Sequence, residues 1–223
     1  MFGVFINVGS SSYNPSGRGR ILKDYRFEFL PIPEMRKTSD KIPTYRDLGF
    51  SRVKFPDLQV HLDPEFETFT YGHVRRGFGD IANLTKMKKD DCLFLYATLE
   101  NEDGWAPYII GYFRNPEVFD CRRLTNAKIL SLKSKGFGNC AHLKRVDPHV
   151  DLLIKGGVGS KRLLKAFPMA EEGNNLALAK RLDDLVLTST SKKVKSGAPW
   201  FRWTLTSSNA EELLEMIEAW QRV

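Results

Sequence analysis

Two apolar runs in the middle of the chain give its clearest structural pattern. Residues 90–99 (DDCLFLYATL) and 105–113 (WAPYIIGYF) are apolar and aromatic, and ENEDG between them supplies residues typical of turns. This pattern predicts a β-hairpin whose first strand is central in a sheet. The run FGVFINV at residues 2–8 ends at a Gly and Ser cluster and predicts another buried strand.

Three further segments have the pattern of strands. YRFEFLPI at residues 25–32 predicts a half-buried strand, DLLI at 151–154 a short strand, and WFRWTLT at 200–206 an alternating strand. Five prolines between Pro31 and Pro64 leave little helical periodicity, so that stretch is expected to be mostly irregular. Long loops of this kind often carry functional residues.

Helical patterns lie between and after these strands. Short or amphipathic helices are expected at residues 80–87, 160–167 and 176–187, and a mixture of short helix and loop at 121–150. Ser208 and Glu211 have the spacing of a capping box and predict a last helix, EELLEMIEAW. Because no repeat or linker is evident, we expect one compact α+β domain over residues 1–223, with a central mixed sheet and peripheral helices.

Composition narrows the class of protein. Hydrophobic residues make up 42% and aromatic residues 12% of the chain, which is typical of a globular protein with an aromatic core. The 34 Lys and Arg exceed the 27 Asp and Glu, and the net charge of +7 favours a polyanionic partner such as nucleic acid.

Cysteine usage and the N-terminus indicate a cytoplasmic protein. Cys92, Cys121 and Cys140 are odd in number and widely spaced, so neither a disulfide framework nor a CxxC metal site is expected. The N-terminal apolar run is too short to cross a bilayer and lacks a basic flank, so neither export nor a membrane partner is expected.

The glycine cluster in DLLIKGGVGSKRLLKAF raises the question of a phosphate-binding loop. A nucleotide-hydrolase loop needs Lys directly after its last Gly and then Ser or Thr, but Gly159 is followed by Ser160, Lys161 and Arg162. We therefore expect no such loop and no cofactor. Free backbone amides before a helix, with Ser160, Lys161 and Arg162, could still contact a phosphate of a nucleic acid. A tight turn with a solvated basic face explains the segment equally well.

A second pattern of chemical interest is VHLDPEFET. His61, Asp63 and Glu65 alternate, so in an extended segment they would share one face and could bind a metal ion or act as acid and base. The pattern signals a metal only weakly, and a local turn at Asp63 is the simpler explanation. No motif of a hydrolase, zinc protease or deaminase is present, and Cys140 with His142 does not suffice for a catalytic dyad.

Aromatic and basic residues are interleaved in several segments rich in turns. Stacking planes beside guanidinium groups are what recognition of an unpaired base requires. Tyr96 and Tyr112 could equally be core residues of their strands, and Arg75 and Arg76 could simply be solvated. The residues in question are Arg18, Arg20, Tyr71, His73, Arg75, Arg76, Tyr96, Trp105 and Tyr112.

Several of these stretches together resemble the nucleotide modification associated domain family, type three. The resemblance is carried by FINVGSSS, RGRI, RFEFLPIPE, HLDPEFETFTYG, DDCLFLYATL, GYF and GSKRLLKAFP. It implies a companion of DNA-base hypermodification systems, with protein partners from such a system, but it implies no particular reaction. The hairpin is also similar to the strand pair of PUA-like domains (EVE, ASCH, YTH), which implies a small barrel with an aromatic-lined pocket.

Two functional hypotheses follow, beside a plain protein-interaction subunit. The first is an accessory domain that binds nucleic acid, DNA rather than RNA, or a modified base within it. Its phosphate contacts would be Arg18, Arg20, Arg75, Arg76, Ser160, Lys161 and Arg162, and its base contacts Tyr71 and Trp105. The second is an enzyme acting on a nucleotide or nucleic acid, with Asp63 and Glu65 as acid, base or metal ligands and His61 beside them.

Overall fold

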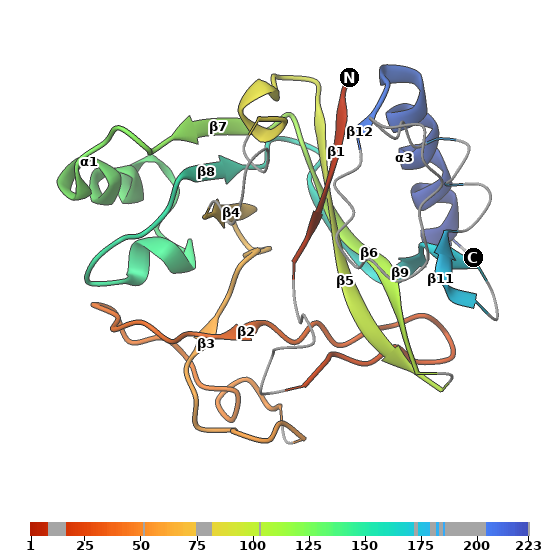
Figure 1. Cartoon of the computed structure of the whole chain (residues 1–223), viewed down its shortest axis with the longest axis horizontal. Helices are drawn as coiled ribbons and strands as arrows, with labels where there is room; N and C mark the ends of the chain where they lie inside the picture. The colour runs from red at the N-terminus through yellow and green to blue at the C-terminus, as the bar shows by residue number, and fades with distance from the viewer. Residues whose placement is uncertain are drawn as a thin grey trace.

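The computed structural model describes residues 1–8, 17–50, 52–74, 82–102, 104–171, 174–178, 182, 185 and 204–222. Of residues 171 and 174–178 it describes the backbone alone. Its centre is a five-stranded sheet in the order β12-β1-β5-β6-β9 (Figure 1). The strands are β1 (Gly3–Asn7), β5 (Cys92–Asn101), β6 (Gly104–Arg114), β9 (Lys161–Pro168) and β12 (Thr204–Leu205). Because β1 is parallel to β5 and the other pairs are antiparallel, the expected mixed sheet and α+β class are confirmed.

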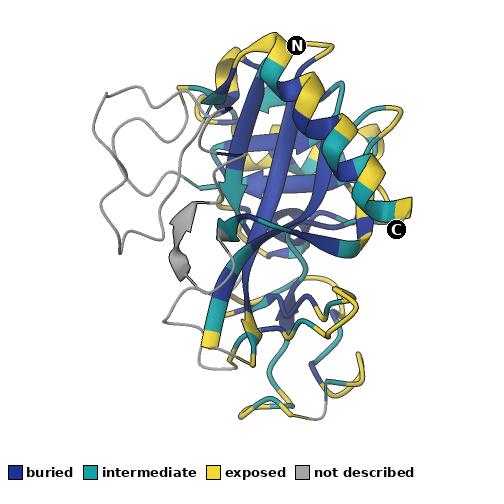
Figure 2. Cartoon of the chain, turned by 90° about the vertical axis from the view of Figure 1, so that its right-hand side faces the viewer, coloured by how far each residue is buried: buried dark blue, intermediate teal, exposed yellow. Residues whose placement is uncertain are grey.

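The β5–β6 hairpin and the strand β1 lie where the sequence predicts them. β5 is buried from Cys92 to Leu99 because the sheet is covered on both faces. Leu93 and Leu95 belong to the hydrophobic cluster that extends toward the second sheet, whereas Phe94 and Tyr96 belong to the cluster under the C-terminal helix. Figure 2 shows this helix, α3 (Ser207–Arg222), with its buried side on the sheet and its exposed side outward.

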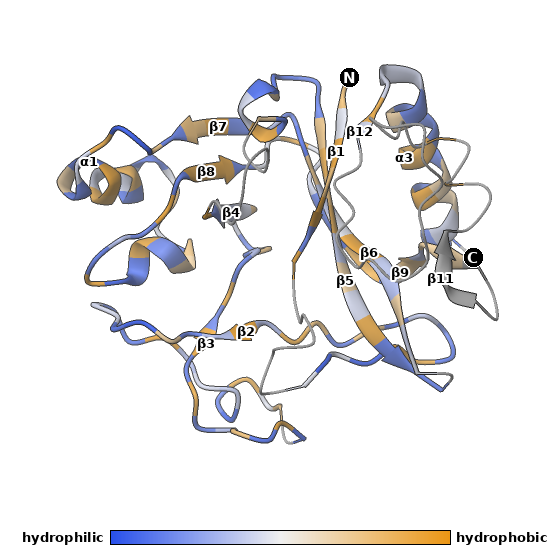
Figure 3. Ribbon diagram, in the orientation of Figure 1, coloured by the Kyte–Doolittle hydropathy of each residue, from blue (hydrophilic) through white to orange (hydrophobic). Residues whose placement is uncertain are grey.

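A three-stranded antiparallel sheet, in the order β4-β8-β7, lies beside the first (Figure 1). Its strands are β4 (Thr70–His73), β7 (Glu117–Asp120) and β8 (Leu152–Lys155), the last at the predicted place. The expected mixture of short helix and loop packs against it, as α1 (Asn126–Ser131), η2 (Leu132–Lys135) and η3 (Ala141–Lys144). Phe137, Leu143 and Leu153 are central in the cluster between them. Figure 3 shows apolar residues along β1, β8 and much of β5.

The proline-punctuated stretch is mostly irregular, as expected. In its described residues, the strands are the two-residue pair β2 (Ile32–Pro33) and β3 (Val60–His61), which run antiparallel. A small cluster of Leu30, Tyr45 and Val60 holds this region together. The remaining short elements are η1 (Leu84–Lys86), β10 (Ala170–Glu171) and β11 (Asn174–Leu178).

The expected helix at residues 160–167 is wrong, because this segment forms strand β9. β9 pairs antiparallel with β6, and Leu163 and Phe167 are buried in the cluster under α3. A short run that mixes basic and apolar residues suits either a helix or a strand. The hydrogen-bonding edge that β6 offers decides the outcome, which the local sequence does not encode.

Other expectations hold only in part. Within the expected strand at 25–32, Arg26 and Phe27 form isolated bridges and Ile32 begins β2, while Tyr25, with a φ of 63°, is not extended. The expected helix at 176–187 overlaps strand β11, and beyond it the structure describes only Leu182 and Leu185. The helix at 80–87 is described from residue 82, where it is the single turn η1, and the strand at 200–206 is described from residue 204, where it is β12.

The last helix begins one residue before the predicted cap. Ser208 and Glu211 lie inside α3, and the hydroxyl of Thr206 accepts the backbone N–H of Asn209 at 3.4 Å. A threonine in front of two serines offers an earlier cap, so the cap predicted at Ser208 is wrong by two residues.

The described part of the five-stranded sheet has two edges, at β12 and β9, so a barrel-like closure is not confirmed. One domain over residues 1–223 stays a prediction. Within the described residues, no helix combines the length and apolar character that crossing a bilayer requires.

Candidate functional site

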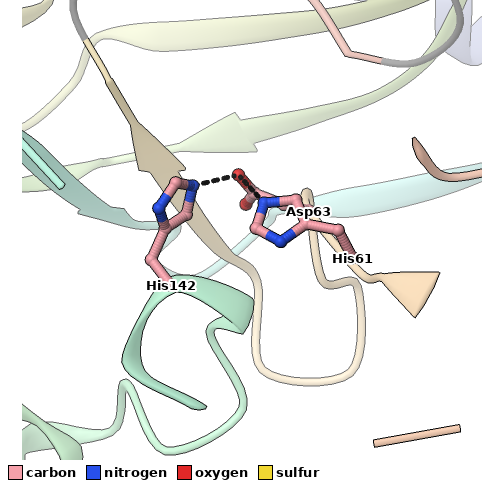
Figure 4. Close-up of side chains that lie close together, drawn as sticks. All are labelled: His61, Asp63 and His142. Carbon is pink, nitrogen blue, oxygen red and sulfur yellow. Dashed lines mark ion pairs between the residues drawn. The ribbon is translucent and has the colours of Figure 1, made fainter. Parts of the chain in front are cut away.

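Two histidines and one aspartate from distant segments meet beside β4. His61 ends β3, Asp63 follows it by two residues, and His142 lies in η3. The Oδ2 atom of Asp63 is 3.7 Å from the Nε2 of His61 and 3.3 Å from the Nε2 of His142. Figure 4 shows both imidazole rings directed at this carboxylate. All three side chains are nearly inaccessible, with exposed fractions of 4 to 6%.

A buried ion pair supports His61 from its other side. The Nδ1 of His61 lies 2.7 Å from Glu34 Oε2, and Arg145 donates from Nε to the same oxygen at 3.0 Å. Burial by itself raises the pKa of Glu34, but the hydrogen bonds from His61 and Arg145 outweigh it and lower the pKa to about 2. Glu34 is therefore ionised and can only accept, so the Nδ1 of His61 carries a proton.

His142 is held in the corresponding way. Its Nδ1 lies 2.8 Å from the backbone carbonyl oxygen of His149, and a carbonyl oxygen can only accept a hydrogen bond. A proton on Nδ1 would satisfy this carbonyl, whereas a proton on Nε2 would be donated to Asp63 and would leave Nδ1 to accept from Arg145. The guanidinium of Arg145 lies beside both rings, 3.0 Å from His142 Nδ1 and 3.3 Å from His61 Nδ1.

The charges of the cluster are unevenly distributed between the two histidines. Burial disfavours every charge here, but the hydrogen bonds of Asp63 to His142 and His61 lower the pKa of the Asp63 carboxyl. Asp63 and Glu34 together raise the pKa of His61. Burial lowers the pKa of His142 and outweighs the opposing effect of Asp63, and repulsion from His61 and Arg145 adds to the lowering. His142 is therefore the neutral ring and His61 the one that takes a proton.

Glycine in the TYGH stretch of β4 makes this arrangement possible. The backbone N–H of Gly72 donates to Asp63 Oδ1 at 2.9 Å and fixes the carboxylate. A Cβ at this position would clash with the ring of His142, because the ring packs directly on the glycine. The residues on either side of Gly72 form a pair of their own, with the Tyr71 hydroxyl 3.0 Å from His73 Nδ1.

Two of the three pairs of donor atoms are spaced roughly as a metal ion would need them. One ligand atom each from His61, Asp63 and His142 lies within 4.8 Å of the other two. Bonds of about 2.0–2.2 Å to one ion put neighbouring donors about 3–3.5 Å apart, close to the two distances measured to Asp63. Metal-binding histidines typically donate their other ring N–H to a carboxylate or a carbonyl; His61 Nδ1 lies on the Glu34 carboxylate and His142 Nδ1 lies on the His149 carbonyl. Three protein ligands would leave positions for water or substrate.

Glu65 does not join this group, although it alternates with His61 and Asp63. Its carboxylate accepts hydrogen bonds from the backbone N–H of Glu67 and from the N–H and hydroxyl of Thr68. Glu65 therefore closes the turn between residues 65 and 70, which its backbone also bridges. The sequence hypothesis placed three residues on one face, and the structure brings only the first two together.

The residues after the glycine cluster have structural partners. The hydroxyl of Ser160 donates to Gly157 O at 2.7 Å and accepts from Arg114 N at 3.1 Å. Lys161 forms an ion pair with Glu218 of α3 at 2.9 Å, and Arg162 lies over the ring of Phe27 at 5.7 Å. Because the segment that follows is a strand, no helix N-terminus is present there to bind an anion.

The other residues expected to bind nucleic acid are spread over the molecule. Arg18 lies 5.5 Å above the Trp105 ring, and Arg20 is 3.7 Å from Glu100, near the turn between β5 and β6. Tyr71 is buried, and Arg75 and Arg76 lie outside the described residues. Tyr96 and Tyr112 are core residues, and the Tyr112 hydroxyl donates to Glu218.

The sequence hypotheses missed Glu34, His142 and Arg145. The chain contains only four histidines, and three belong to this region: His61, His142 and, through its carbonyl, His149. That scarcity is a usable signal, whereas the spacing of Cys140 and His142 considers His142 only as a partner of the cysteine. Glu34 and Arg145 gave no local signal, because their partners are far away in the sequence.

Comparison with known proteins identifies one family. The family model described as nucleotide modification associated domain 3 matches residues 3–222, a range that includes every residue of the cluster. No curated protein matches the chain, and no solved structure matches it.

Proposed function

Because the chain belongs to the nucleotide modification associated domain 3 family, we propose that it is a metal-dependent enzyme of a nucleotide-modification system. Its metal ligands would be His61, Asp63 and His142, and its substrate a nucleotide or nucleic acid. The observation that carries this proposal is the convergence of two Nε2 atoms on one carboxylate oxygen, while each Nδ1 atom faces a hydrogen-bond acceptor.

The donor set indicates which ions to expect. Two imidazoles and one carboxylate suit Zn²⁺, Fe²⁺ or Mn²⁺, whereas Mg²⁺ prefers oxygen ligands and retains several waters. Buried ion-pair networks also bring such residues together, but they do not require both rings to present the same nitrogen to one point. The Glu34–Arg145 pair would fix the orientation of His61 and limit the charge of the loaded site.

Such a centre could supply more than one kind of chemistry. A bound ion polarises a phosphoryl or carbonyl oxygen, or lowers the pKa of a bound water enough to make it a nucleophile at neutral pH. The low exposure of the three side chains would keep bulk water away from the reaction.

Metal titration tests this proposal directly. Calorimetry with Zn²⁺, Mn²⁺ and anaerobic Fe²⁺ should give one site per chain, and the bound ion should raise the melting temperature. Asp63→Asn keeps an acceptor for Gly72 but should weaken binding at least about tenfold, and so should His142→Ala. Glu67→Gln, an exposed carboxamide change in the same loop, is the matched control. Equal affinity in all four proteins, or none in the unmodified chain, would refute the proposal.

A second candidate function is nucleic-acid binding without catalysis. The observation that favours it is the Arg18–Trp105 pair, with Arg20 close by, because a guanidinium over an indole is a surface on which a base can stack. Ser160, Lys161, Arg162, Arg75 and Arg76 remain proposed phosphate contacts, although Lys161 already pairs with Glu218. DNA binding that weakens steeply with salt in metal-free protein would support this candidate.

A further inference from the structure

The positive charge of the chain is concentrated in one segment beside the candidate metal centre. Residues 121–146 contain no Asp or Glu, and outside them the remaining 27 Lys and Arg equal the 27 Asp and Glu of the whole chain. The net charge of +7 therefore resides in this segment, which also supplies His142. Its seven cations are Arg122, Arg123, Lys128, Lys133, Lys135, Lys144 and Arg145.

The end of this segment pairs with the chain that leaves Glu34. Thr38 forms a β-bridge with Arg145, and hydrogen bonds join Ser39 N to Lys144 O and Val146 N to Lys37 O. We call residues 35–39 and 144–146 the basic ribbon. Its backbone connects directly to the centre, because Glu34 precedes one strand of the ribbon and the Arg145 side chain enters the centre from the other.

The outer surface of the basic ribbon carries cations and exposed apolar groups. Arg36 and Lys37 are exposed, and Met35 and Val146 are exposed by 78% and 53%. Lys144 is partly exposed, and among the described residues no carboxylate lies within ion-pair distance of these three cations. Asp40 follows the ribbon directly in the sequence, and its pKa is lowered first by its hydrogen bond with Lys133 and further by Lys144.

We propose that the basic ribbon binds the phosphodiester backbone of a nucleic-acid strand and brings that strand to the metal centre. Cations on two adjacent strands can contact successive phosphates of a polymer, whereas a free nucleotide presents its phosphates at one point. Met35 and Val146 suit the sugars and bases of such a strand. The interpretation as a substrate surface rests on the proposed function and specifies its substrate as a polymer.

Fluorescence anisotropy with a labelled oligonucleotide tests this inference. Single-stranded DNA, duplex DNA and RNA are each titrated with the full chain across a salt series. The double variant Lys37→Glu/Lys144→Glu should bind the preferred probe at least about tenfold more weakly near 0.1 M salt. It should also reduce the magnitude of the slope of log K against log salt by about 2. Unlabelled nucleoside mono- and triphosphates at millimolar concentration should not displace the probe.

The control pair Lys86→Glu/Lys89→Glu makes the same change in net charge at exposed positions outside the ribbon. Equal loss in both pairs would mean that only net charge matters and would overturn the inference, as would displacement by free nucleotides or absence of binding at low salt. Loss in Arg18→Ala/Arg20→Ala but not in the ribbon pair would also overturn it and would favour the second candidate function.

The two proposals fail separately. The ribbon variant should retain metal affinity, and Asp63→Asn should retain oligonucleotide affinity. If the chain binds the probe at the ribbon but binds no metal, the enzyme proposal is refuted and the docking surface is supported. Metal binding at the centre without probe binding would refute the docking surface and leave the enzyme proposal standing.

Discussion

The backbone N–H of Gly72 donates a hydrogen bond to Asp63 Oδ1 at 2.9 Å, and this contact aligns the carboxylate with two histidine rings. It also ties the irregular segment after β3 to the regular sheet that carries β4. The other oxygen of the carboxylate remains directed at His61 and His142. A sheet backbone thus positions the central ligand of the candidate metal centre.

Gly72→Ala should disrupt the centre more than it disrupts the fold. The added Cβ would occupy space held by the His142 ring, so the ring must move away from Asp63. We expect a loss of about 1–3 kcal/mol in the free energy of unfolding, typical of overpacking, and a weaker metal affinity. Denaturant unfolding and metal titration measure the two effects.

Gly138→Ala is the control for that substitution. A Cβ there meets only Lys133 O, at 3.8 Å, and the position does not have a positive φ. Its stability and metal affinity should remain near those of the unmodified chain. If both variants bind metal equally well, close packing of His142 on Gly72 is not needed for the site.

Glu34→Gln should destabilise the protein strongly although it changes few atoms. The neutral amide leaves the buried guanidinium of Arg145 without its anion, and breaking a buried pair in this way costs about 3–5 kcal/mol. Chemical denaturation measures the loss. Asp57→Asn, which removes the partner of Arg46 on the exposed surface, should have little effect. Comparable losses in the two variants would contradict the assigned role of Glu34.

The same carboxylate predicts how stability depends on pH. The pKa of Glu34 falls from an ordinary value of 4.5 to about 2 in the folded protein, so its contribution is present above pH 4.5 and is lost as the pH falls toward 2. The lowered pKa of Asp63 acts in the same direction. Unfolding free energies measured between pH 6 and 2 should decrease, and Glu34→Gln should flatten the decrease. Parallel curves for both proteins would contradict this assignment.

The sequence reveals the hairpin because β5 and β6 are long and apolar, and it misplaces β9 because that strand depends on a partner. KRLLKAF has no strong local preference, and only the edge of β6 makes it extended. In the site, too, local features are predictable and features that depend on distant partners are not. His61 and Asp63 are two residues apart and were predictable as a pair, whereas His142 and Arg145 reach them through packing between distant segments.

Trp105→Ala and Tyr71→Phe separate the two candidate functions. Trp105 lies near the β5–β6 turn under Arg18, so if the accessory hypothesis holds, its removal should weaken single-stranded DNA binding by about 1–3 kcal/mol. Tyr71 is buried, and its hydroxyl contacts His73, so the phenylalanine should cost about 1 kcal/mol of stability without changing DNA affinity. Anisotropy and denaturant unfolding of both variants measure these effects.

Under the enzyme proposal, Trp105→Ala leaves metal affinity unchanged. If it abolishes metal binding instead, the centre depends on the β5–β6 turn, and the two candidate functions are not independent.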